Sequence, residues 1–251
     1  MSILIQFIFR LSFGLALGMA LTNPRQVTSG YYRNHLYVLL GLNVLATMVA
    51  ISAPDQFSLV PPLAAAILSY VGSLAWLFEK PKLGIAILAA IAALTLWGAW
   101  DATTWPVSAD ALQAILVALA PLTSGLVLGI TIAAMFLGHW YLNSPTMALG
   151  PLERLVVLMG GAICIRAAVE AVGLGLALSQ SPWPSTEGWS FLALRWLSGL
   201  VGAFALTVMA WKTLKIPNTQ AATGILYVAV IVTFLGELTS LLMAAQAGAL
   251  R

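Results

Sequence analysis

The chain has 251 residues, of which 61% are hydrophobic and 8% are charged, and its formal net charge is +3. An average soluble domain carries about 25% charged residues, so a water-exposed globular fold of this length is excluded. Apolar stretches of roughly 20 residues recur along the whole chain, which is typical of transmembrane α-helices and not of the alternating strands of a membrane β-barrel. We therefore interpret the excess of Lys and Arg over Asp and Glu as a signal for orientation in a membrane, and we expect no nucleic-acid partner.

The sequence predicts an all-α integral membrane protein with about eight transmembrane helices joined by short turns. In chain order, the expected spans are residues 3–22, 35–53, 60–78, 83–100, 112–137, 152–178, 190–211 and 222–246. The first span lacks the basic start and the cleavage site of a signal peptide, so we expect it to be retained. No connection is long enough to form a soluble domain.

Charge alternates between successive connections. Those after the first, third, fifth and seventh spans hold the basic residues Arg25, Arg33, Lys80, Lys82, Arg154, Lys212 and Lys215. The others hold Asp55, Asp101, Asp110 and Glu187, with no Lys or Arg. Cytoplasmic loops of membrane proteins carry an excess of Lys and Arg. We therefore expect a bacterial-type inner membrane protein with both termini on the non-cytoplasmic side.

The two halves of the chain, residues 1–110 and 111–251, resemble each other. The segment from Ser12 to Gly18 aligns with the segment from Thr123 to Gly129, and each carries two small residues four positions apart, which indicates close helix packing. A second set of landmarks, Ala75, Trp76, Pro81 and Gly84, aligns with Ala210, Trp211, Pro217 and Gly224. Four spans per half predict a parallel repeat about an axis along the membrane normal. Chance similarity between Leu/Ala/Gly-rich segments is the alternative.

Five ionisable residues lie inside the expected spans: Arg10, Arg166, Glu170, Arg195 and Glu237. Because burial in a membrane is costly, such residues indicate a functional site by default. Arg166 and Glu170 are four residues apart and can pair on one helix face, and Arg10 and Glu237 are candidate partners across the first and last spans. We expect an outward-facing pocket that serves a quinone headgroup, a proton path or a substrate. The alternative is a set of ion pairs that fix helix register or contact a partner subunit.

The chain has two histidines, His35 at the expected start of the second span and His139 at the end of the fifth. They could be the axial ligands of a single b-type haem, or ordinary interfacial anchors. The expected loop from Gly138 to Met147 places His139 beside Tyr141, a pair that can hydrogen-bond a quinone carbonyl and exchange protons. The same residues also suit an interfacial turn.

Metal and nucleotide chemistry have no sequence signal. The lone cysteine, Cys164, excludes an intrachain disulfide and a multi-cysteine metal site, and there is no phosphate-binding glycine loop. The chain also lacks ligands for an iron–sulfur cluster. Any redox chemistry must therefore be shared with a partner, such as an iron–sulfur protein or a cytochrome.

The eight-span architecture, together with Phe234-Leu235-Gly236-Glu237-Leu238 in the last span, resembles the NrfD/PsrC family of polysulfide reductase membrane subunits. Ser240-Leu241 stand where an arginine would be expected after the Gly-Glu pair. The resemblance implies a haem-free, quinone-interacting subunit of an electron-transfer complex, with Glu237 at the site. Three alternatives stay open: a secondary transporter, a structural or assembly subunit, and a single-haem carrier.

Overall fold

The computed structural model describes residues 2–105, 110–144, 146–180, 186–216 and 218–249. Its elements within these residues are nine α-helices and one π-helix. In chain order they are α1 (Ser2–Ala20), α2 (Ser29–Ser52), α3 (Val60–Leu77), α4 (Pro81–Asp101), α5 (Ala111–Asn143), α6 (Gly150–Gln180), α7 (Thr186–Ala193), the π-helix η1 (Leu194–Gly202), α8 (Ala203–Leu214) and α9 (Thr219–Ala249).

Eight of the helical segments are long and apolar enough to cross a membrane, with α7, η1 and α8 together forming the seventh. The predicted all-α fold and the number of spans are therefore confirmed. Two boundaries differ, because α2 already begins at Ser29 and α5 continues to Asn143. Polar residues at a membrane interface can extend a helix beyond its apolar stretch, so hydropathy alone ends such spans too early. The side chain of Glu187 and the residue Pro217 fall outside the described part of the chain.

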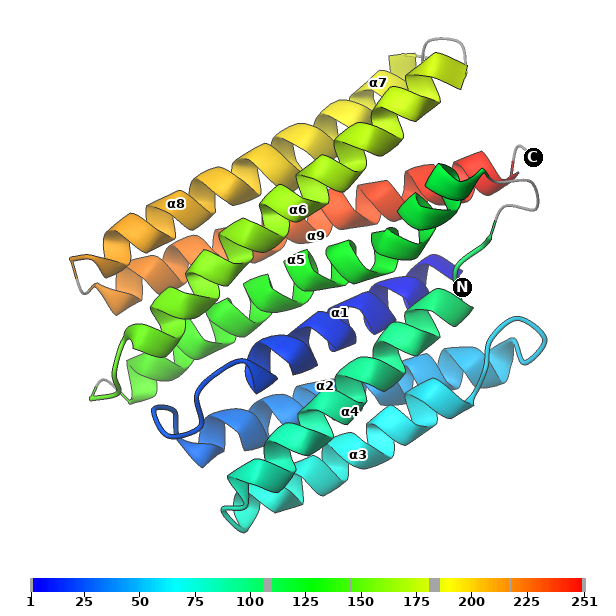
Figure 1. The fold of residues 1–251 in the computed structure, drawn as a ribbon. Coiled ribbons are helices and arrows are strands. Elements are labelled where there is room, and N and C mark those ends of the chain that lie inside the picture. Colours follow the sequence, from blue (N-terminus) through cyan, green and yellow to red (C-terminus); the bar gives the residue numbers. More distant parts are fainter. Residues whose placement is uncertain (1, 106–109, 145, 181–185, 217, 250–251) are drawn as a thin grey trace.

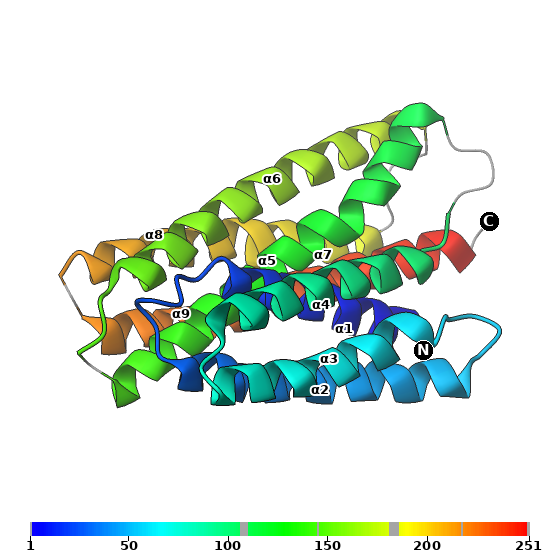
Figure 2. The same ribbon diagram turned by 60° about the horizontal axis from the view of Figure 1, so that its bottom comes forward.

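The helices form two side-by-side groups, α1–α4 and α5–α9 (Figures 1 and 2). In the first group α1 packs on α2 and α4, and α3 packs on both of these. In the second group α5 packs on α6 and α9, and α8 packs on both of these. The order of contacts around the two groups is thus the same, as a parallel repeat predicts. The repeat itself stays a prediction.

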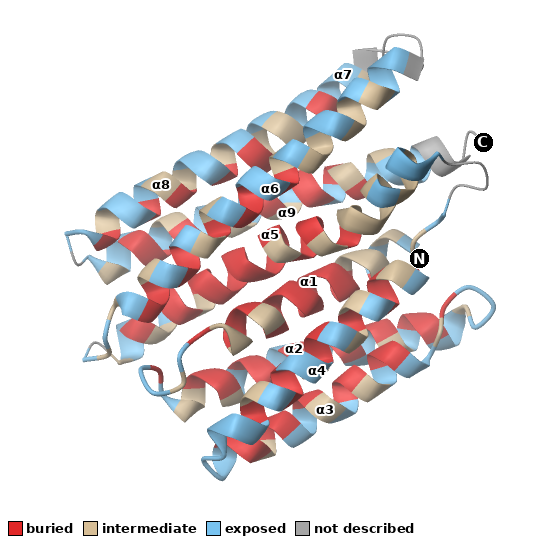
Figure 3. Ribbon diagram, viewed as in Figure 1, coloured by how far each residue is buried: buried red, intermediate tan, exposed pale blue. Residues whose placement is uncertain are grey.

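The groups meet mainly along α1 and α5, where glycines let the two backbones touch. A Cβ atom on Gly14 would overlap the backbone of Gly125, and one on Gly129 would overlap the backbone of Gly14. A Cβ on Gly18 would lie 2.8 Å from the Ala133 side chain. The close packing predicted for the two aligned segments is confirmed. α1 and α5 are accordingly among the most buried helices (Figure 3).

The second set of repeat landmarks does not have equivalent packing in the two halves. Trp76 is buried and stacks on Tyr32 with ring centroids 3.8 Å apart, and Gly84 lies directly against its indole. Trp211 is exposed, and a Cβ on Gly224 would meet nothing within 4 Å. The first half therefore has an aromatic core that the second half lacks at this level.

Exposed residues lie on the outside of both groups (Figure 3), and many of them have large apolar side chains. Met48, Ile67, Leu197 and Ile231 are between 56% and 66% exposed, and they lie on four different helices. In water such a surface would be unfavourable, whereas lipid chains solvate it without cost. The structure thus has the outer surface of a multi-pass membrane protein.

Candidate functional site

The interior of the second group contains a network of charged side chains. Arg166 on α6 donates from Nε to Oε1 of Glu237 on α9 at 3.0 Å, and from Nη2 to Oε2 at 2.9 Å. Both side chains are at least 95% buried. A parallel two-bond contact between guanidinium and carboxylate is the strongest geometry that such a pair can adopt. Glu237 therefore has its charge balanced by a residue that hydrogen-bonds both of its oxygens.

Glu170 extends this network along α6 and across to η1. Its Oε1 lies 2.7 Å from Nη2 of Arg166, which confirms the predicted pairing one helical turn apart, and its Oε2 pairs with Nη2 of Arg195. Thr123 on α5 and Ser240 on α9 accept further hydrogen bonds from Arg166. The network has two positive and two negative charges and joins all of the long helices of the second group except α8.

An irregular backbone positions this network. Arg195 is the second residue of the π-helix η1, and single-turn π segments inside α-helices often occur at functional sites. Later in η1, a Cβ on Gly199 would lie 2.6 Å from Cα of Gly236, the residue before Glu237. The two backbones therefore touch beside the network, and η1 and α9 hold Arg195 and Glu237 at a fixed separation.

Arg10 differs from the other four charged residues because it forms no ion pair with the described residues. Only 5% of its surface is exposed, and its Nη2 donates to Oε1 of Gln6 at 2.6 Å, while the Gln6 amide donates to the carbonyl of Ala102. Its Nε has no hydrogen-bond partner, and no carboxylate of the described residues lies within ion-pair distance of it. The expected direct pair between Arg10 and Glu237 is wrong, because Arg166 occupies both oxygens of Glu237.

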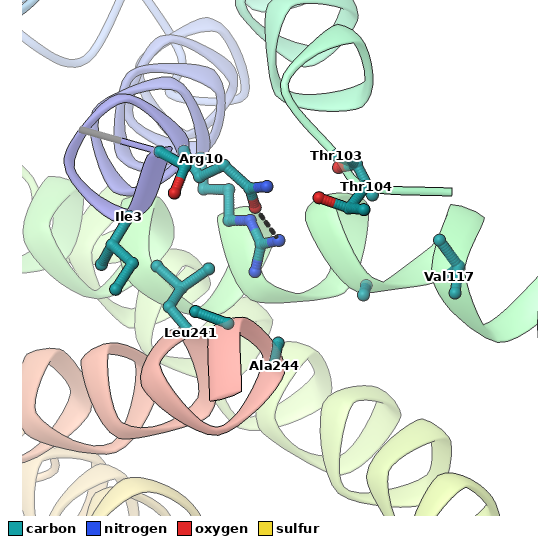
Figure 4. Close-up of a pocket in the computed structure, with 11 residues that line it drawn as sticks. Ile3, Arg10, Thr103, Thr104, Val117, Leu241 and Ala244 are labelled. Atoms are coloured by element: carbon teal, nitrogen blue, oxygen red, sulfur yellow. Dashed lines mark hydrogen bonds between the residues drawn. The ribbon is translucent and has the colours of Figure 1, made fainter. Parts of the chain in front are cut away.

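A cavity of about 180 Å³ lies beside Arg10 at the end of the bundle where α1 starts and α9 ends (Figures 1 and 4). Its polar lining is Ser2, Gln6, Arg10, Thr103 and Thr104. Its apolar lining is Ile3, Val117, Ala120, Leu241, Ala244 and Ala245. In Figure 4, the Arg10 side chain lies between the threonines on one side and Leu241 on the other. The expectation of a single pocket for all five charged residues is therefore wrong. Of the five, only Arg10 lines this cavity, and the other four pair with each other.

Pro121 adds a backbone acceptor near this cavity. It lies inside α5 and, having no N–H, cannot bond to the carbonyl four residues earlier, which belongs to Val117. Val117 lines the cavity. Helices bend at an internal proline, and α5 changes direction along its length in Figure 2. The wall on this side therefore includes Val117, whose carbonyl lacks the usual hydrogen bond to the residue four positions later.

His139 and Tyr141 do not lie in a loop, as the sequence had suggested. Both are in the last turns of α5, at the opposite end of the bundle from the Arg10 cavity. Tyr141 is buried and donates to the carbonyl of Ala148, and His139 is exposed with its Nδ1 3.2 Å from the Tyr227 hydroxyl. These contacts pin the turn after α5 and the start of α9 in place. They match the alternative of an interfacial anchor.

The histidines do not fit a shared haem. His35 is not at a helix start but in the second turn of α2, where its ring packs against Phe136 and Tyr31 with centroids 4.4 and 4.6 Å away. Its Nδ1 is 2.6 Å from the carbonyl of Tyr31, whereas His139 turns to Tyr227 on α9. Neither lines the Arg10 cavity, and a ligand the size of haem needs a pocket of several hundred Å³.

Sequence reasoning missed Gln6, Thr103 and Thr104. Gln6 could have been found, because it precedes Arg10 by one helical turn and a buried arginine needs an acceptor. The two threonines follow α4 at a distance of more than 90 residues from Arg10 in the chain, and no local pattern connects them. Within the described residues, no group of three or more His, Cys, Asp or Glu could hold a metal ion.

No protein-family model matches the chain, and neither the curated proteins nor the solved structures include a significant match.

Proposed function

We propose that this chain is the quinone-interacting integral membrane subunit of an electron-transfer complex, with the quinone headgroup bound in the Arg10 cavity. The observation that supports this proposal is the state of Arg10. It is a buried guanidinium with no carboxylate partner in the described residues, beside a cavity whose remaining walls are mostly apolar. A buried charge without a partner is costly, and a ligand oxygen would offset this cost.

A quinone headgroup matches the chemistry of the cavity. It is flat and apolar, with a carbonyl oxygen at each end that accepts hydrogen bonds. Arg10 would donate to one carbonyl, with Gln6 holding the guanidinium in place, and Thr103 or Thr104 could donate to the other. The volume of about 180 Å³ is below the 300–1,000 Å³ of complete ligand pockets. It suits a headgroup whose isoprenoid tail leaves between the helices into lipid.

The charge balance favours the ligand in its reduced, anionic forms. Away from their ends, the spans hold three arginines and two glutamates, and the glutamates pair with Arg166 and Arg195, which leaves Arg10 as the excess positive charge. The sequence has no set of ligands for an iron–sulfur cluster, so the quinone would exchange its electrons with a partner subunit. Under this proposal both termini and the cavity face the non-cytoplasmic side of a bacterial-type inner membrane.

Equilibrium binding of a short-chain quinone to the purified chain in lipid nanodiscs tests the proposal. We expect saturable binding that Arg10→Gln weakens by about 10-fold or more, since a charge-assisted hydrogen bond is lost. Arg33→Gln is the matched control, because it removes the same charge near the opposite end of the bundle. Binding that is not saturable, or that is equally strong in Arg10→Gln, would refute the proposal. Melting temperatures of the variants separate lost binding from lost folding.

A structural or assembly subunit is the second candidate, and the network around Arg166 supports it. All four of its charges are paired within the chain, as they would be if they only fixed the helices. In that case alanine substitution of Arg166 and Glu170 would strongly reduce the amount of assembled complex. The turnover of each complex that does assemble would stay unchanged. No contact in the described residues specifically favours a transporter.

A further inference from the structure

A second cavity lies at the end of the bundle opposite to Arg10, between the end of α1 and the start of α4. It has a volume of about 530 Å³ and is lined by Ala20, Pro24, Arg25, Pro81, Lys82 and Ile85. Two of these six residues are cationic, and the rest are apolar or proline. The α1–α2 connection and the start of α4 come together at one end of the molecule in Figure 1.

The two cations are free to bind a ligand. Arg25 and Lys82 are exposed, and neither forms an ion pair with a described carboxylate. The backbone N–H of Arg25 bonds to the Asn23 side chain, whereas its guanidinium forms no ion pair with the described residues. Two unpaired positive charges that line one cavity create a local positive potential that attracts an anion.

The backbone of α4 adds to this potential. The helix begins at Pro81, and Lys80 before it provides no side-chain cap for the first N–H groups. The positive end of a helix dipole and free N–H groups bind phosphate and other anions. This contribution is independent of the two side chains, and it is directed at the same cavity because Pro81 and Lys82 are part of the lining.

The apolar part of the lining indicates where such an anion comes from. Ala20 and Ile85 continue the cavity toward the packed surfaces of α1 and α4, and Leu83 beside it is 48% exposed on the outer, apolar surface. A soluble anion would gain nothing from this wall, whereas the acyl chains of a lipid would cover it. Basic pockets between transmembrane helices at the cytoplasmic side typically bind anionic lipid headgroups.

We infer that this cavity is a binding site for an anionic phospholipid, with its phosphate between Arg25 and Lys82 and its acyl chains along α1 and α4. The site is separate from the Arg10 cavity and does not depend on quinone binding. It would hold the α1–α2 and α3–α4 connections to the surface of the cytoplasmic leaflet.

Native mass spectrometry of the full chain, released from nanodiscs of phosphatidylcholine and phosphatidylglycerol, tests this inference. We expect retained phosphatidylglycerol that falls about 10-fold or more in Arg25→Gln/Lys82→Gln, since each basic residue near the surface contributes severalfold to affinity. The matched control is Arg33→Gln/Lys212→Gln, which removes two charges from the same end of the bundle and should change retention less than twofold. Ile85→Trp, which fills the cavity without a change of charge, should also lower retention.

Three results would overturn the inference. They are unchanged retention in Arg25→Gln/Lys82→Gln, equal losses in the control variant, and unchanged retention in Ile85→Trp. Inorganic phosphate at millimolar concentration is added in a parallel measurement. If the cavity retains phosphate in place of phosphatidylglycerol, its preferred ligand is the free anion and the assignment to a lipid is overturned as well.

Discussion

Arg166 and Glu237 form a two-bond ion pair between α6 and α9, with nitrogen–oxygen distances of 3.0 and 2.9 Å. The contact joins residues that are 71 positions apart in the chain, on two helices that are long and apolar enough to cross a membrane. Breaking a buried pair on one side leaves a charge with no counter-ion, whereas replacing both partners by apolar residues removes the burial cost as well. This difference makes the role of the pair testable.

We expect Glu237→Leu alone to destabilise the protein by about 3–5 kcal/mol, because Glu170 is then the only carboxylate in the network and must compensate both Arg166 and Arg195. The double variant Arg166→Met/Glu237→Leu should be more stable than Glu237→Leu, since Glu170 and Arg195 still neutralise each other. Thermal melting in mild detergent measures both. Lys215→Met is the control, because it breaks an exposed pair with Glu153 that contributes about 1 kcal/mol or less. A double variant that melts below Glu237→Leu would show that the pair stabilises the fold beyond charge balance.

Sequence periodicity was sufficient for the eight spans because each apolar stretch must match the bilayer thickness. It also predicted the contact between Arg166 and Glu170, which is local, and the close packing at Gly14 and Gly129, which needs only small residues. The sequence-based prediction of Arg10 as the partner of Glu237 is wrong. Arg10 and Arg166 are both expected at a membrane depth similar to that of Glu237, so depth alone does not distinguish them. Only the arrangement of α6 against α9 decides between them.

The contact of α1 with α5 at Gly129 should tolerate no side chain. Gly129→Ala places a Cβ into the backbone of Gly14, so the helices must separate, and overpacking of this kind costs about 1–3 kcal/mol. Gly161→Ala on α6 is the matched control, because its Cβ would meet nothing within 4 Å and alanine favours helix. We expect a lower melting temperature for Gly129→Ala only. Equal melting temperatures would mean that the two groups of helices are not packed as closely as the structure has them.

The aromatic stack at Tyr32 and Trp76 gives a test of whether the two halves pack alike. Gly84→Ala would push a methyl group into the Trp76 indole, which is buried and cannot move freely. Gly224→Ala, at the aligned position of the second half, would enter open space. We expect destabilisation of about 1–3 kcal/mol for the first substitution and almost none for the second, measured by thermal melting and by Trp fluorescence. Comparable effects at both positions would contradict the packing difference between the halves.

We expect the termini on the non-cytoplasmic side, because one set of expected connections holds seven basic residues and the other set holds none. Labelling with a membrane-impermeant maleimide tests it, in a Cys164→Ser background that carries one new cysteine at an exposed loop position. Asp55→Cys should be labelled in intact cells, because its connection lies at the same end of the bundle as the termini. Lys80→Cys should be labelled only after the cells are permeabilised. The reverse pattern would place the Arg10 cavity on the cytoplasmic side and the Arg25–Lys82 cavity on the other. It would thereby remove the argument from the anionic leaflet for the lipid site.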